Sequence, residues 1–64
     1  MKELDIVELT EEFEGLAIGT EGVIVGEHDG RNFEVEFFDS NDETIDVFTT
    51  SRNVLKVTFP FVDK

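Results

Sequence analysis

The sequence predicts an all-β fold in which five short antiparallel strands form a small, strongly bent barrel. Apolar and acidic residues alternate after Asp29-Gly30, which is the period-two pattern of a strand with one buried face. The apolar positions do not recur at the spacings of three and four that indicate a helix. A chain of 64 residues is also too short for helices that cross over a parallel sheet, because each crossover needs about a dozen residues.

Turn-forming residues separate the five strand segments. Asp29-Gly30 predicts a tight hairpin, because such turns need a positive φ that Gly adopts without strain. Gly26 predicts a bulge or bend within its strand, and Pro60 predicts a strand end or a sheet edge. No helix longer than one turn is expected. The strands are expected near residues 4–9, 21–28, 32–38, 44–50 and 54–59.

The alternation also assigns side chains to the core. Phe13 is expected to fold back from an acidic loop as an anchor, and Phe48 is expected to point outward. In the first strand, Val7 and Leu9 are expected to face the core, and Leu4 and Ile6 form the alternative face. The inward positions are otherwise expected at Phe33, Val35, Phe37, Ile45 and Val47.

The charge balance limits the classes of partner. Sixteen acidic residues against five basic ones give a formal net charge of −11, which argues against binding to phosphate backbones or anionic membranes. The carboxylates form either a solvated surface that maintains solubility or an acidic face for a basic partner. The absence of cysteines excludes disulfides and thiolate metal sites. With neither a secretion signal nor a long apolar run, a cytoplasmic location is expected.

Several motifs, spread from Glu3 to about Val57, carry a resemblance to a known family. They are residues 3–10, Gly15-Leu16, Gly19, residues 22–25, Asp29-Gly30 and residues 33–37. Together they resemble a family of short bacterial proteins catalogued as a domain of unknown function. The resemblance implies an SH3-like barrel and brings no catalytic residues. The segment 19–25 is also similar to the KOW module of ribosomal and transcription proteins.

The polar residues contain no convincing catalytic or metal-binding constellation. His28 stands beside Asp29 and is interpreted as an exposed histidine before a turn, because a catalytic histidine needs further groups around it. Asp39, Asn41 and Glu43 alternate like the start of a calcium loop, but the glycine and closing glutamate of such a loop are missing. No catalytic residue, metal site or cofactor is therefore expected.

Four phenylalanines are the candidate partner-binding residues. They are Phe38, Phe48, Phe59 and Phe61. Phe38 and Phe48 fall on the outward side of the alternation, and the other two flank Pro60 on a short apolar tail. Exposed aromatic groups on small domains often mark partner sites. The alternative is that these rings wrap the ends of a core too small to have a clean outside.

We therefore expect residues 1–64 to form one non-enzymatic binding domain without a cofactor. Its partner is expected to be a protein, bound through the phenylalanines with acidic residues around them, and neither a nucleic acid nor a membrane. A weak homodimer through Phe59 and Phe61 is also considered. The alternative is an immunity or antitoxin-like protein, or a nucleic-acid mimic, that uses its carboxylates against a basic partner.

Overall fold

The computed structural model describes residues 1–62 and confirms the all-β class. One turn of 3-10 helix, η1 (Arg52–Val54), lies before the last strand, and every strand boundary is within two residues of its expected position. The strands are β1 (Ile6–Leu9), β2 (Glu21–Glu27), β3 (Asn32–Phe38), β4 (Thr44–Ser51) and β5 (Leu55–Phe59).

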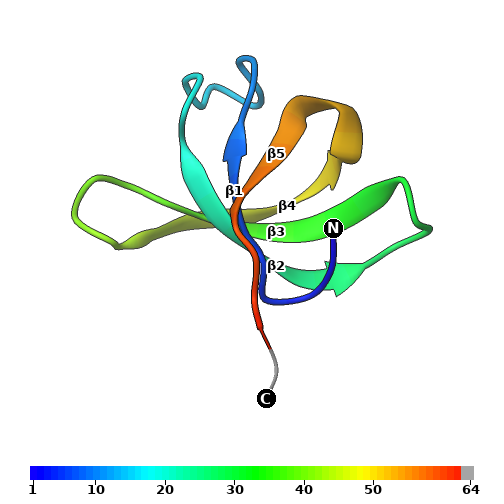
Figure 1. Ribbon diagram of the computed structural model, residues 1–64. Coiled ribbons are helices and arrows are strands. Elements are labelled where there is room, and N and C mark those ends of the chain that lie inside the picture. Colours follow the sequence, from blue (N-terminus) through cyan, green and yellow to red (C-terminus); the bar gives the residue numbers. More distant parts are fainter. Residues whose placement is uncertain (63–64) are drawn as a thin grey trace.

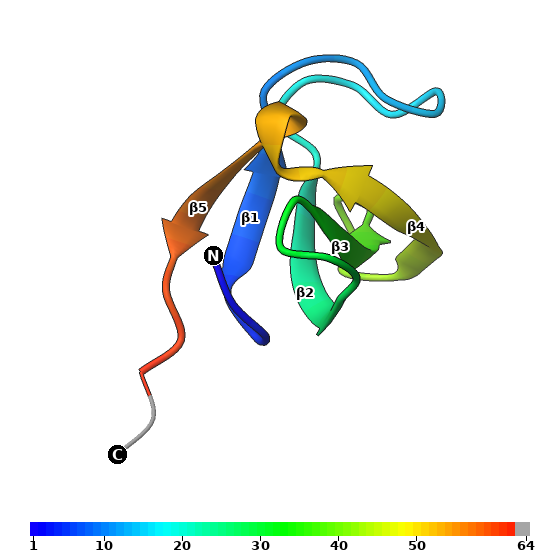
Figure 2. The ribbon, with the colours of Figure 1, turned by 90° about the vertical axis from the view of Figure 1, so that its right-hand side faces the viewer.

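The strands form one antiparallel sheet in the order β4-β3-β2-β1-β5. β4 and β5 are its two edges, and residues 1–62 contain no hydrogen-bonded ladder between them. The sheet is thus strongly curved but not closed, in contrast to the barrel expected from the sequence (Figure 1). Closure would need β5 to pair with β4 as well as with β1, but η1 separates the two strands along the chain and β5 has a ladder with β1 alone. Figure 2 shows β4 and β5 on opposite sides of the molecule.

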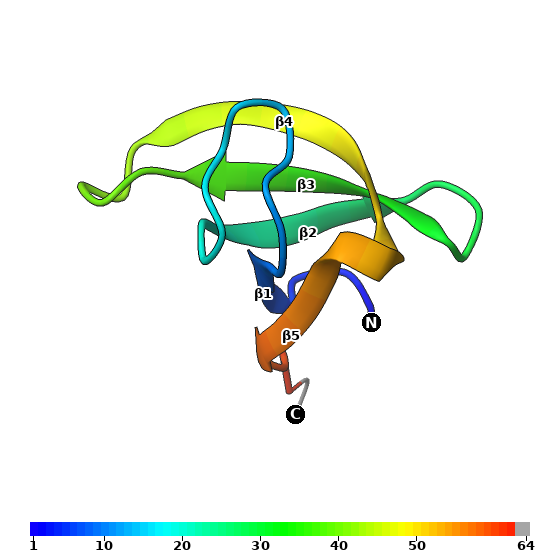
Figure 3. The same ribbon diagram turned by 90° about the horizontal axis from the view of Figure 1, so that it is seen from above.

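The concave face of the sheet carries the core. A long excursion between β1 and β2 arches over this face (Figure 3). Phe13, from that excursion, is a loop anchor as expected. The centroid of its ring lies 5.9 Å from that of Phe48 and 6.5 Å from that of Phe37. The buried apolar residues are Val7, Leu9, Ile24, Phe33, Val35, Phe37 and Leu55. Val7 and Leu9, rather than Leu4 and Ile6, are therefore the inward set of the first strand.

The expected orientation of β4 is wrong. Phe48 pairs with buried Val35 and packs against the core, whereas Val47 pairs with Glu36 and is 47% exposed. Residues directly opposite each other in a ladder point to the same face of the sheet. Ile45 is likewise exposed. The register with β3 therefore turns Phe48 inward and Ile45 and Val47 outward.

The turns form as their residue types predict. Gly30 has a φ of 82°, and Asp29 Oδ1 accepts hydrogen bonds from the backbone N–H groups of Arg31 (3.0 Å) and Asn32 (2.8 Å). The ladder between β2 and β3 shifts register between Ile24 and Gly26, which confirms the expected bulge. The β2–β3 turn and the β3–β4 loop lie at opposite ends of the sheet (Figure 3).

Candidate functional site

The four candidate phenylalanines do not form one cluster. Phe48 belongs to the core, so its expected outward orientation is wrong. Phe38 is half-buried and lines a hollow near the β3–β4 loop. Phe59 and Phe61 lie on the C-terminal segment and are 70% and 41% exposed. The structure therefore offers two separate aromatic surfaces.

The first surface is a shallow apolar hollow of about 450 Å³ beside the C-terminal segment. Leu4 and Ile6, from the start of the chain, also line it; neither was expected at a partner site, although both are apolar and flank an acidic residue. We call it the C-terminal hollow. Its lining residues are Leu4, Ile6, Phe59, Pro60, Phe61 and Val62.

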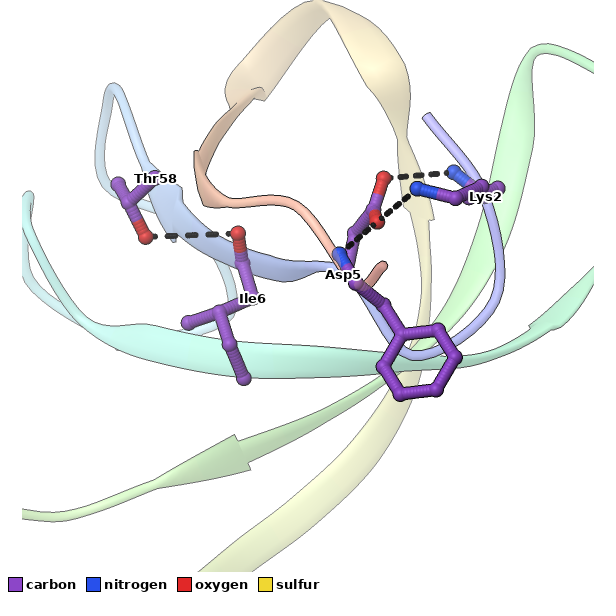
Figure 4. Close-up of polar contacts among 5 residues, drawn as sticks. Lys2, Asp5, Ile6 and Thr58 are labelled. Atoms are coloured by element: carbon purple, nitrogen blue, oxygen red, sulfur yellow. Dashed lines mark hydrogen bonds and ion pairs between the residues drawn. The ribbon is translucent and has the colours of Figure 1, made fainter. Parts of the chain in front are cut away.

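The buried carboxylate of Asp5 fixes the geometry of this hollow. One oxygen accepts hydrogen bonds from the ammonium group of Lys2 (2.7 Å) and from the backbone N–H of Phe61 (2.8 Å). The other oxygen accepts from the backbone N–H of Lys2 at 3.0 Å. Figure 4 shows Lys2 folded back onto Asp5. Asp5 thus joins the amino-terminal turn to the C-terminal segment.

The hydrogen bonds of Asp5 determine its protonation state. Burial alone would raise the pKa of this carboxyl, because it penalises the charged form. The bonds from the Lys2 side chain and from the backbone of Phe61 and Lys2, with the positive charge of Lys2, outweigh burial and lower the pKa. Asp5 is therefore a charged carboxylate at neutral pH, and both of its oxygens accept hydrogen bonds.

Leu4 adopts a backbone conformation that is unusual for its residue type. Its φ is 74°, in the left-handed region, where a non-glycine residue costs about 1–2 kcal/mol. Its N–H donates to the carbonyl oxygen of Ile24 (2.7 Å), and the N–H of Ile24 donates to that of Asp5 (3.1 Å). These two bonds offset the strain and aim Leu4 into the C-terminal hollow while Asp5 points to the interior.

A row of outward side chains continues from this hollow across the convex face of the sheet. The ladders pair Phe59 with Ile6, Ile6 with Val23, Val23 with Glu36, and Glu36 with Val47. Four of these five residues are apolar. One row therefore links the exposed apolar groups at the two edges of the sheet, with a single carboxylate between them.

The second aromatic surface is acidic. Phe38 lines a hollow of about 520 Å³ whose other apolar members are Ile18 and Ile45, and whose carboxylates are Glu21 and Asp39. This hollow lies beside the β3–β4 hairpin, residues 32–51, which contains six acidic residues and no Lys or Arg. Of the four candidates, Phe38 is therefore the one with acidic residues around it.

The charged residues are sparsely paired. Within residues 1–62, ion pairs form only between Lys2 and Asp5 (2.7 Å) and between Lys56 and Glu8 (3.2 Å). Arg31 and Arg52 line a separate polar hollow together with Asn32, Ser51 and Asn53. The carboxylates of the β3–β4 hairpin consequently face solvent without a cationic partner from the described chain.

The remaining polar candidates take structural positions. His28 is exposed, and its backbone N–H donates to the carbonyl oxygen of Asn32 across the β2–β3 turn (2.9 Å). Asp39 Oδ1 accepts from the backbone N–H groups of Asn41 (2.8 Å) and Glu43 (3.0 Å), so it orders the β3–β4 loop. In the described part of the chain, no three His, Asp or Glu side chains are grouped to hold a metal ion.

Comparison with known proteins places the chain in a family. The family model described as "Domain of unknown function (DUF4926)" matches residues 3–57. The chain belongs to the DUF4926 family. No curated protein and no solved structure matches it. The DUF4926 match contains Asp5 and the whole β3–β4 hairpin, and it ends before Phe59. In residues 1–62 the structure has no helix long and apolar enough to cross a membrane.

Proposed function

We propose that this DUF4926 chain is a non-enzymatic binding module that holds another protein in its C-terminal hollow. An SH3-like relationship of the fold is part of the proposal. The long β1–β2 excursion, the 3-10 turn before β5 and the strong curvature of the sheet support that relationship. The proposed location is the cytoplasm.

One observation carries the proposal. Two exposed phenylalanines are each tied to the start of the chain, since the buried Asp5 carboxylate accepts the backbone N–H of Phe61 at 2.8 Å and Phe59 pairs with Ile6 in the sheet. Exposed apolar patches on small proteins mark interaction sites. A preordered patch also loses less conformational entropy when a partner binds than a mobile tail would lose. The C-terminal hollow therefore has both the apolar surface and the rigidity that a docking site needs.

Affinity capture from the native cell, at low and at high salt, tests this proposal. The wild type should retain a partner at high salt, because apolar contacts are little affected by screening. Phe59→Ser with Phe61→Ser should lose that partner. Ile18→Ser is the control, since it removes an exposed apolar side chain that does not line the hollow. If the double phenylalanine variant still retains the partner at high salt, the proposal is contradicted.

A second function is favoured by the charge of the β3–β4 hairpin. Six carboxylates without a Lys or Arg are suited to a basic partner, as in an immunity protein, an antitoxin or a nucleic-acid mimic. Binding of that kind weakens steeply with salt. This function is favoured over the first if the partner is lost at high salt and if the double variant Phe59→Ser with Phe61→Ser still captures it at low salt.

A weak homodimer is the other arrangement that could cover the C-terminal hollow. Each buried phenylalanine contributes roughly 1.5–3 kcal/mol, and repulsion between the two acidic chains is screened beyond about 8 Å at physiological salt. Sedimentation at increasing concentration would detect the dimer. A double variant, Phe59→Ser with Phe61→Ser, that sediments as a folded monomer would place the contact in the hollow.

A further inference from the structure

The two edges of the sheet differ in how well they are protected against pairing with another strand. Proteins protect an exposed edge with short strands, lysines, prolines and bulges. β5 has all four: it is five residues long, contains Lys56, is followed by Pro60, and shifts register where it pairs with Ile6 and Val7. Strand addition at β5 is therefore obstructed.

β4 is long and carries little of this protection. It spans eight residues without Lys, Arg, Pro or Gly. Its one irregularity is near Ile45, and residues 46–51 face residues 32–37 in unbroken register. No strand of the described chain pairs with its other side. Residues 46–51 are thus a regular, open template.

The hydrogen-bonding groups of this template face outward. The backbone N–H of Val47 donates to the side-chain Oδ1 of Asp46 at 2.7 Å, so it is not used in the ladder with β3. N–H groups of alternate residues point to the same side of a strand, so the N–H of Thr49 also faces the open edge. Asp46 is exposed, and its side chain can leave Val47 when a better acceptor arrives. The edge therefore offers at least two donors to an added strand.

The charge around the edge selects the occupant. The β3–β4 hairpin carries six carboxylates and no cationic side chain. An added strand would bring its outward side chains next to Val47 and Thr49, with Glu34 and Glu36 one strand further on the same face. Lys or Arg at those positions would be attracted by the carboxylates. A second copy of this chain would place six further carboxylates against the first six, which opposes association through β4.

We propose that β4 accepts an extended, basic segment of another protein, which adds to the sheet as a sixth strand beside residues 46–51. In this mode of recognition, main-chain hydrogen bonds provide affinity and alternate side chains provide specificity. The site goes beyond the C-terminal hollow, because β4 and β5 are opposite edges of the sheet. It also lies wholly within the residues that define the DUF4926 match. Each of the two surfaces can be tested while the other is intact.

The probe is a synthetic peptide of the length of β4 in which Val alternates with Lys. Two control peptides accompany it: one with Glu in place of Lys, and one N-methylated at every backbone nitrogen. The Lys peptide should bind and should slow hydrogen exchange at the N–H groups of Val47 and Thr49. The N-methylated peptide, which has no main-chain donors in either register, should bind about tenfold more weakly or worse. The Glu peptide should not bind.

Substitutions on the protein test the same contact. Val47→Pro removes an outward N–H and should abolish binding. Proline is tolerated on an edge where its nitrogen faces solvent, so this variant should still fold. Val47→Thr keeps the N–H and should preserve binding. Glu34→Gln with Glu36→Gln should weaken binding several-fold at low salt. The new amide oxygens can still accept from the Thr49 and Thr44 hydroxyls, now bonded at 2.7 and 2.6 Å.

The proposal is overturned if the Lys peptide fails to bind at millimolar concentration, or if the N-methylated peptide binds equally well. The second comparison leaves the protein unaltered, so it decides the matter even if Val47→Pro does not fold. If the double variant Phe59→Ser with Phe61→Ser no longer binds the peptide, the peptide binds in the C-terminal hollow and not at β4. If the wild type forms a dimer and Val47→Pro is monomeric, a second copy of this chain occupies the β4 edge. Either result also overturns the proposal.

Discussion

Replacing Asp5 by Asn keeps the shape of the side chain and removes its charge. The carboxylate is almost completely buried and accepts three hydrogen bonds, two of them from backbone N–H groups. Asn provides one acceptor oxygen and one amide nitrogen, and that nitrogen would face a donor. The substitution should therefore loosen the contact between the amino-terminal turn and the C-terminal segment without opening a cavity.

The size of the effect follows from the bonds that are lost. Hydrogen bonds to a charged group contribute about 1.5–3 kcal/mol each. The ion pair with Lys2 adds at most about 1 kcal/mol, because the lysine side chain is 57% exposed. Since Asn preserves part of this network, we expect a loss of about 2 kcal/mol. Domains of this size lose roughly 4–8 °C of Tm per kcal/mol, which predicts a Tm lower by about 8–16 °C.

The pH dependence provides the more specific assay. The pKa of Asp5 is lowered in the folded protein, so its contribution is fully present above the unfolded pKa of about 3.9. That contribution is lost as the pH falls through the folded value. Thermal melts of the wild type and of Asp5→Asn should differ most at pH 5–7 and should converge in strong acid. Hydrogen exchange at the N–H of Phe61 should be faster in the variant at neutral pH.

Glu3→Gln is the matched control, because it removes the same charge from an exposed neighbour. It should change stability by no more than about 0.5 kcal/mol. Equal melting temperatures for Asp5→Asn and Glu3→Gln at neutral pH would refute the role assigned to Asp5. A difference from the wild type that persists undiminished in strong acid would refute the electrostatic explanation.

Two further predictions concern packing and net charge. A Cβ at Gly22 would lie 2.7 Å from Val35 Cγ1 and 2.8 Å from the Glu36 carbonyl oxygen, so Gly22→Ala should destabilise the fold by about 1–3 kcal/mol. Gly26→Ala is its control, because the nearest atom would lie at 3.7 Å, and equal denaturation midpoints for the two variants would contradict this account. Because the net charge is −11, stability should rise modestly from pH 8 towards about pH 5, and also with added salt at neutral pH. Melting temperatures that fall steadily over that pH range would exclude the second prediction.

The strands and the turns between them could be predicted from local residue types. The reason is that both depend on short-range chemistry. Asp29 and Gly30 form their turn with bonds spanning two or three residues, and Asp39 orders its loop in the same way. The alternation between 33 and 37 likewise needs no information from the rest of the chain.

Three features depend on contacts between residues that are far apart along the chain. β4 carries at least one apolar residue on each face, so the choice between Phe48 and Val47 as the inward residue depended on its register with β3. The sheet is open because β5, which follows η1, pairs with β1 and not with β4. The C-terminal hollow depended on Asp5 meeting Phe61, which follows it by 56 residues. Pairings over such distances are fixed by the packing of the whole chain, and no local pattern records them.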